Sequence, residues 1–262
     1  MPYLTSEIPW EGVTDFTTGN FTTPSVHQSF YKVLPLLQNI QTWHLAQVTF
    51  AHLRDTPREA FTLPRLHTLI LDHSHPPEIF NVLVTPSLRS LIFECSVHVN
   101  TLKHIHTLIA HSSCSIESLL FDEIYGEDMD NEWVNFSREK PIRESIRNLQ
   151  LPLDLLAQPR VLRAFHFVPE EDVYPVFPHL RSLTMYGDTL TSRSRTLSSE
   201  VVDMLASRRN VENLNFVVGS VSPLEMFFSR GPVDSFELTE LETVSRFKEL
   251  RRGGLVYSRI MD

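Results

Sequence analysis

A short apolar pattern recurs along most of this 262-residue chain. It consists of an apolar residue, two variable residues, a second apolar residue, one variable residue and a third apolar residue. Clear copies begin at Ile40, Leu66, Leu88, Ile116, Ile146, Leu180 and Val211, and a weaker copy begins at Val13. Neighbouring copies start about 30 residues apart, a period that is typical of stacked repeats rather than of one continuous core.

The last three positions of each copy predict a short strand with one buried face, because apolar and variable residues alternate there. The spacing is that of a leucine-rich repeat. One such unit cannot bury its own apolar face, and stacking neighbours in parallel supplies the missing half of the core. We therefore expect an α/β fold, a single leucine-rich-repeat solenoid over residues 1–262 with about eight irregular repeats. A curved parallel β-sheet would form its concave face, with helices and loops on the convex face.

The segments between the predicted strands differ in character. Residues 101–109 and 198–205 predict helices, because their apolar residues recur every three to four positions. Residues 236–252 predict a C-terminal capping helix, whereas residues 122–140, rich in Asp and Glu, predict an acidic loop insertion. The run from Leu162 to Phe167 imitates the repeat pattern at half a period. The repeat count between residues 146 and 180 therefore stays open.

The amino-acid sequences of several copies resemble those of a known family. Residues 63–69 read leucine-proline-x-leucine-x-x-leucine, residues 85–91 are a close variant, and residues 113–119 contain a Cys-Ser-x-x-x-Leu version. Together with the Ile-Pro-Trp phrase at residues 8–10, these phrases resemble the repeat region of mushroom-type (basidiomycete) F-box proteins over residues 8–217. The resemblance implies the substrate-recognition part of an F-box-type ubiquitin-ligase receptor. In complete family members, an F-box docks on a cullin-type ubiquitin-ligase adaptor.

The F-box itself is not visible in this sequence. It would open with a Leu-Pro-x-Glu-Leu/Ile phrase, and residues 1–40 contain none. Two alternatives stay open: the recognition part of a longer F-box receptor, or a stand-alone leucine-rich-repeat scaffold with no ubiquitin-ligase link. The ligase adaptor is expected as a partner only if an F-box exists upstream.

The outward positions of three consecutive predicted strands form two rows. Side chains that alternate with the buried motif residues face outward from a sheet. The apolar row consists of Ile70, Ile92 and Leu120, and the acidic row consists of Asp72, Glu94 and Asp122. Such rows predict a surface for a protein partner with a basic, partly apolar segment. The alternative is that these side chains only stabilise the sheet through cross-strand pairing.

Composition narrows the classes of partner. The chain has 23 Lys and Arg against 32 Asp and Glu, a net charge of −9, which disfavours nucleic acids and anionic membranes. No apolar run approaches the roughly 20 residues of a membrane span, and the first residues do not read as a secretory leader. We therefore expect a cytoplasmic or nuclear monomer that binds a protein.

No residues point to catalysis, a cofactor or a metal. The His and Cys residues lack the close pairs that bind zinc. Asp128–Glu132 resembles the opening of a calcium loop, but Trp133 replaces the Gly that such a loop needs for its sharp turn. Phosphate-loop, nucleophile-elbow and zinc-protease motifs are missing from the sequence. We therefore expect a non-enzymatic protein.

Overall fold

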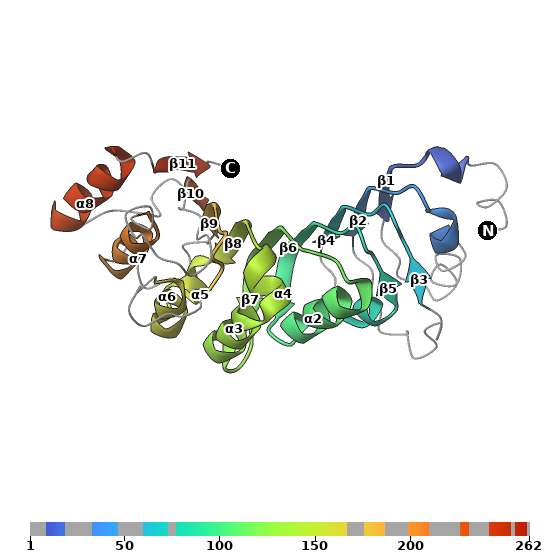
Figure 1. The fold of residues 1–262 in the computed structure, drawn as a ribbon, viewed down its shortest axis with the longest axis horizontal. Coiled ribbons are helices and arrows are strands. Elements are labelled where there is room, and N and C mark those ends of the chain that lie inside the picture. Colours follow the sequence, from blue (N-terminus) through green and yellow to red (C-terminus); the bar gives the residue numbers. More distant parts are fainter. Residues whose placement is uncertain are drawn as a thin grey trace, which may run out of the picture. The chain divides into compact units, whose positions relative to one another are not determined.

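The computed structural model describes residues 9–18, 33–46, 60–72, 77–166, 176–186, 199–209, 226–230, 241–252 and 255–260. These residues form a mixed α/β fold that is based on a parallel sheet (Figure 1). The chain divides into two compact units, residues 1–118 and 119–262. Within the described residues, no helix is long and apolar enough to cross a membrane.

The strands of the first unit follow one another in chain order. They are β1 (Asp15–Thr18), β2 (Thr42–Ala46), β4 (Thr68–Asp72) and β6 (Ser90–His98). Each strand pairs in parallel with the next, and Trp43, Leu69 and Leu91 align across three of them. Each of these four strands lies on a predicted copy of the repeat, so the strand prediction is confirmed for them. The central apolar positions of β2, β4 and β6 are fully buried.

The other side of the first unit contains short elements and one long helix. The short elements are η1 (Trp10–Gly12), η2 (Leu34–Leu36), η4 (Pro77–Asn81), β3 (Phe61–Thr62) and β5 (Leu83–Val84). The long helix is α2 (Thr101–Ser112), and it packs against η4 and β5 (Figure 1). Its apolar stripe from Leu102 to Ile109 is buried. The prediction of a helix at residues 101–109 is therefore confirmed.

The second unit repeats the arrangement with more α-helices among the described residues. Its strands, in sheet order, are β7 (Ser118–Tyr125, which starts at the end of the first unit), β8 (Asn148–Pro152), β9 (Ser182–Tyr186), β10 (Met226–Arg230) and β11 (Val256–Ile260). Its helices are α3 (Met129–Arg138), α4 (Lys140–Ser145), α5 (Leu153–Leu156), α6 (Pro159–Phe165), α7 (Ser199–Arg209) and α8 (Leu241–Arg252). Strands β8 to β11 pair in parallel with aligned first residues. Helix α7 confirms the prediction at residues 198–205.

Residues 122–140 do not form the acidic loop that the sequence predicted. They comprise the end of β7, all of α3 and the start of α4. Trp133 and Phe136 lie on the buried side of α3, while the acidic side chains around them are at least partly exposed. The prediction was wrong because Asp122 and Glu123 belong to β7, while Asp130 and Glu132 lie on the outer side of the amphipathic helix α3.

Two further segments that the sequence singled out are also described. The half-period pattern, whose place in the repeat count the sequence left open, is helical from Leu162 to Phe165, within α6 (Pro159–Phe165). The helix predicted at residues 236–252 is α8, but β11 follows it and forms the last strand of the described sheet. The strand predicted after Val211 lies outside the described residues, and the sheet position beside β9 belongs to β10.

Strands β2, β4, β6, β7 and β9 begin with the same pair of backbone hydrogen bonds. The carbonyl of Gln41 accepts the N–H groups of both His67 and Thr68, at 2.8 and 3.0 Å. The carbonyls of Thr14, His67, Arg89 and Arg147 accept the corresponding pair of N–H groups from the next repeat. We call this the shared-carbonyl contact, because one acceptor aligns two successive donors. It sets the register between neighbouring strands at the point where they start.

Aromatic residues and one arginine fill the core of the second unit. Trp133 has no exposed surface and lies 5.9, 5.6 and 6.4 Å, between ring centroids, from Phe121, Phe136 and Phe177. Burying a side chain of this kind contributes about 2 to 3 kcal/mol or more to stability. The guanidinium of Arg208 is also buried, and it donates hydrogen bonds to backbone carbonyls that include that of Phe177 at 2.8 Å. Arg208 therefore ties α7 to the segment that precedes β9.

Candidate protein-binding surface

The outward face of β2, β4 and β6 carries part of each predicted row. The register places Ile70 beside Ile92 and Asp72 beside Glu94. Along β2 and β4, every outward residue is half-buried and every inward residue is buried. Glu94 is exposed. The face therefore presents a mixed apolar and acidic surface, which we call the acidic face; its binding role stays a prediction.

His44 joins the two rows, and the sequence analysis did not include it among the site residues. It lies in β2 beside Ile70, in register with the apolar row. Its Nε2 atom is 3.8 Å from the Glu94 Oε2 atom, which is close enough for an ion pair when the imidazole is protonated. Because β4 separates β2 from β6, this contact spans Ile70. Only the outward register position of His44 signalled this in the sequence.

The third member of each row belongs to the second unit. Leu120 and Asp122 lie on β7, and both are half-buried. The carboxylate of Asp122 accepts a hydrogen bond of 2.8 Å from the Gln150 Nε2 atom of β8. Gln150 is 7% exposed, so this bond satisfies a buried amide. Asp122 therefore has a structural role that its position in the predicted row did not reveal.

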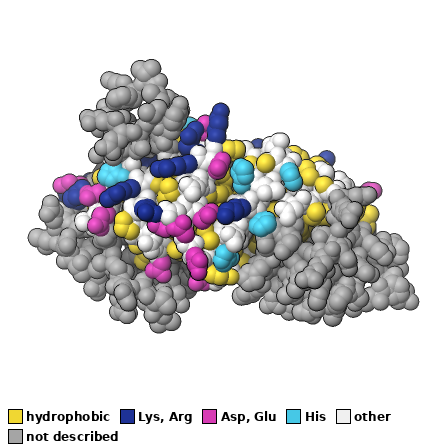
Figure 2. Space-filling view, turned by 90° about the horizontal axis from the view of Figure 1, so that it is seen from below, with side chains coloured by type: hydrophobic (Ala, Val, Ile, Leu, Met, Phe, Trp, Pro, Cys, Tyr) yellow, Lys and Arg dark blue, Asp and Glu magenta, His cyan; other side chains and the backbone are white. Residues whose placement is uncertain are grey.

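In the second unit, the outward face of β8 is more covered than the acidic face. In β8, all residues from Leu149 to Pro152 are buried, including the outward residues Gln150 and Pro152. Ser182 of β9, beside Asn148 in register, is also buried. Helix-side charges in this unit are of mixed sign, since acidic and basic side chains are interspersed in the left half of Figure 2. The acidic face is thus more accessible than the outward face of β8.

The candidate metal and calcium residues are not arranged around an ion. In the part of the chain that the structure describes, no three His, Cys, Asp or Glu side chains are placed to hold a metal. Asp128 precedes α3 with a positive φ of 55°, and its carboxylate accepts a hydrogen bond from Asn131. Trp133, at the position of the missing Gly, is fully buried in the core. The acidic start of this segment therefore begins a helix.

The two cysteines are free, and they differ in environment. Cys95 is half-buried and Cys114 is buried. Burial disfavours the thiolate and raises the pKa of Cys114 from 9.0 to about 11, although a backbone hydrogen bond opposes part of this rise. The Cys114 thiol is therefore protonated at neutral pH and a poor nucleophile.

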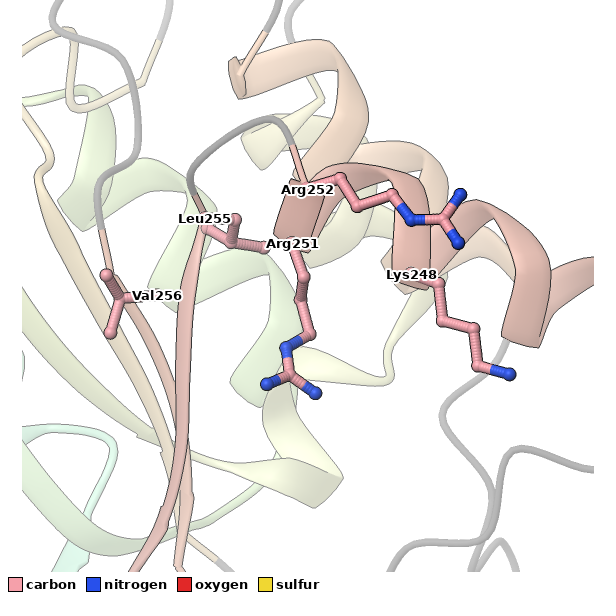
Figure 3. A pocket seen from close by; sticks show the side chains of 5 residues that line it. All are labelled: Lys248, Arg251, Arg252, Leu255 and Val256. Carbon is pink, nitrogen blue, oxygen red and sulfur yellow. The ribbon is translucent and has the colours of Figure 1, made fainter.

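A separate pocket of about 440 Å³, widely open to solvent, lies where α8 leads into β11 (Figure 3). Lys248, Arg251, Arg252, Leu255 and Val256 line it. The guanidinium of Arg251 and the ammonium of Lys248 extend to the same side, while Arg252 points away from Val256. The sequence pattern predicted only a capping helix here, with no indication of a pocket.

Comparison with known proteins adds no relative. The sequence matches no protein-family model and no curated protein.

Proposed function

We propose that this chain is a leucine-rich-repeat solenoid that binds a protein partner through the acidic face. The shared-carbonyl contact supports the repeat assignment, because the same pair of hydrogen bonds recurs at the starts of β2, β4, β6 and β7 and again at the start of β9. The parallel pairing of strands in chain order also supports it. A stack of this kind displays broad surfaces and suits binding better than catalysis.

One observation carries the binding proposal: the acidic face combines exposed carboxylate with partly exposed apolar surface. Ile70 and Ile92 are adjacent, and Asp72 and Glu94 are adjacent one position further along the same outward face. Contiguous apolar surface next to charge of one sign is typical of an interaction site. The matching partner is a segment with Lys or Arg beside an aliphatic side chain.

The resemblance to basidiomycete F-box proteins supports a more specific proposal. It makes the chain the substrate-recognition part of an F-box-type ubiquitin-ligase receptor, with the acidic face as the substrate site. The competing proposal is a stand-alone scaffold with the same binding face and no link to a ligase. Both versions are non-enzymatic.

The binding proposal can be tested with paired variants of the 262-residue chain. The face variant carries Asp72→Asn and Glu94→Gln, and the control variant carries Glu123→Gln and Asp154→Asn in the second unit. We expect partners captured from cell extract by the wild-type chain to be retained by the control and lost by the face variant. Cross-links from those partners should map to β2, β4 and β6. Equal capture by the face variant, with unchanged thermal unfolding, would contradict the proposal.

The ligase link needs a second capture experiment. The longest protein product of the same locus should be compared with the present chain for binding to the cullin-type adaptor. Adaptor capture by a longer product, together with loss of substrate capture in its face variant, supports the receptor. A longest product that captures partners but never the adaptor supports the scaffold instead.

A further inference from the structure

A basic cluster marks the end of α8. Lys248, Arg251 and Arg252 are all exposed and line the pocket shown in Figure 3. Val256, at the start of β11, is 54% exposed, whereas Leu255 is buried. The Leu255 N–H donates a 3.0 Å hydrogen bond to the Leu250 carbonyl, which fastens the strand to the helix. Cationic side chains and an exposed aliphatic side chain are therefore held together by ordered backbone.

Two of these three cationic side chains form no ion pair with an acidic side chain of the described residues. Helix α8 uses Arg246 for its ion pair with Asp203 of α7. Neither Lys248 nor Arg252 forms a hydrogen bond or ion pair with another described residue. Cations in the last turn do stabilise a helix. That effect explains neither the exposure of Val256 nor the adjoining pocket, and the cluster lies in a chain of net charge −9.

Two further arginines lie on the same edge of the second unit. Arg147 and Arg181 immediately precede β8 and β9, whose first residues are aligned, and Leu255 immediately precedes β11. Glu225, at the corresponding position before β10, lies outside the described residues. Both arginine side chains are exposed, and neither forms a hydrogen bond or ion pair through its side chain with another described residue. Three strand spacings separate Arg147 from Leu255, which is about 14 Å. We call this row, together with the α8 cluster, the basic edge.

In the first unit, the arginine at the equivalent position, immediately before a strand, forms an ion pair. Arg89 immediately precedes β6 and pairs with Glu117 at 2.9 Å. Its charge is therefore balanced within the unit. Adjacent like charges such as Arg147 and Arg181 destabilise a sheet unless an anion compensates them.

We propose that the basic edge binds an acidic segment of a partner protein. Carboxylates of the segment contact the cationic side chains, and an apolar residue of the segment covers Val256. About five extended residues span the edge from Arg147 to the pocket. Nucleic acids and other long polyanions fit less well, because the rest of the acidic chain repels them. This inference does not depend on the acidic face, which lies in the other unit and has the opposite charge.

The test uses a labelled peptide in which Glu alternates with Leu, and a matched peptide with Gln in place of Glu. Binding to the full chain is measured by fluorescence anisotropy over a range of salt concentrations. We expect the acidic peptide alone to bind, with an affinity that falls as salt increases. The variant K248Q/R251Q/R252Q should bind at least about tenfold more weakly. The control variant R65Q/R138Q/K140Q removes the same charge elsewhere and should bind like the wild type.

Three results would overturn the proposal. One is unchanged affinity in the triple variant with unchanged thermal unfolding. Another is equal binding of the Gln peptide, and the third is equal or tighter binding of a single-stranded oligonucleotide of the same charge. If the triple variant does not fold, K248Q/R252Q retains Arg251 and its contacts, and it should still weaken peptide binding several-fold.

Discussion

The two units use the same strand pattern but connect their strands differently. In the first unit the strands follow one another closely, with β2, β4 and β6 starting at Thr42, Thr68 and Ser90. Their connections contain short 3₁₀ helices and two-residue strands. In the second unit the intervals are longer, with β7, β8 and β9 starting at Ser118, Asn148 and Ser182, and pairs of α-helices connect β7 to β8 and follow β8. The shorter repeats therefore carry 3₁₀ helices and short strands on their outer side, and the longer repeats carry α-helices.

Chain geometry explains this difference. Each connection runs from the end of one strand back to the start of the next parallel strand. The distance it must cover is therefore about the length of one short strand in every repeat. Extended chain covers about 3.3 Å per residue, a 3₁₀ helix about 2.0 Å and an α-helix about 1.5 Å. A connection with more residues can make the same return as α-helix, whereas a shorter one must use more extended structure.

The largest expected effect is a loss of stability in the core of the second unit but not in that of the first. Trp133→Ala removes the centre of the aromatic cluster and should destabilise the second unit by about 3 to 5 kcal/mol. Hydrogen exchange in α3 and α6 should accelerate, while exchange in β2 and β4 should change much less. Equal acceleration in both units would show that they unfold as one cooperative body. Val134→Ala, on the less buried side of α3, is the matched control.

A second substitution tests how α7 is attached. Arg208→Ala leaves three buried carbonyl acceptors, those of Phe165, Val176 and Phe177, without the guanidinium donors. We expect a loss of about 2 to 3 kcal/mol, measured by urea denaturation. Arg208→Lys should recover only part of this, because one ammonium cannot reproduce the planar set of donors. Full recovery with Lys would mean that charge alone matters at this position.

A buried hydrogen bond joins two residues on the outer side of the first unit. The Thr85 N–H donates a 2.9 Å hydrogen bond to the Ser112 Oγ atom, and both residues are buried. Ser112→Ala should cost about 1 to 2 kcal/mol, because a buried donor is left without an acceptor. Thermal unfolding would measure the loss. Ser113→Ala, at the exposed neighbouring position, should have little effect on stability.

Cys114 provides the most local probe of the first unit. In a Cys95→Ala background, its labelling by a thiol reagent at pH 8 should be about a hundredfold slower than in denaturant, because few thiolates form. Its pKa of about 11 exceeds the ordinary 9.0, so the folded state holds the proton more tightly than the unfolded state. This contribution to stability is complete below pH 9 and is lost as pH rises toward 11. Cys114→Ala should show a smaller loss over that interval, measured by urea denaturation at each pH.

The strands of the first unit were predictable because their signal is local. The alternation in residues 66–71 or 88–93 identifies a half-buried strand without reference to the rest of the chain. Strands β10 and β11 carry no such pattern: their sequences are Met-Phe-Phe-Ser-Arg and Val-Tyr-Ser-Arg-Ile. Their positions depend on pairing with β9 and with each other, which is tertiary information.

The candidate surfaces were predictable only in part, for a related reason. Alternation placed Ile70, Ile92, Asp72 and Glu94 on one face, because register follows from aligned repeats. The approach of His44 to Glu94 joins strands that are not neighbours, and the sequence indicates only that His44 faces outward. The basic edge combines strand starts with a helix end, so its residues are widely separated in sequence.

The shared-carbonyl contact has a consequence for how the chain tolerates insertions and deletions. Because register is set where each strand starts, residues added to a connection change its return path without shifting the strands it joins. Repeats of unequal length, shorter in the first unit and longer in the second, are compatible with one alignment for this reason. A single residue inserted between the shared carbonyl and the strand would instead exchange the inward and outward side chains of that strand. Natural variation in length should therefore concentrate in the connections and avoid the positions immediately beside each strand start.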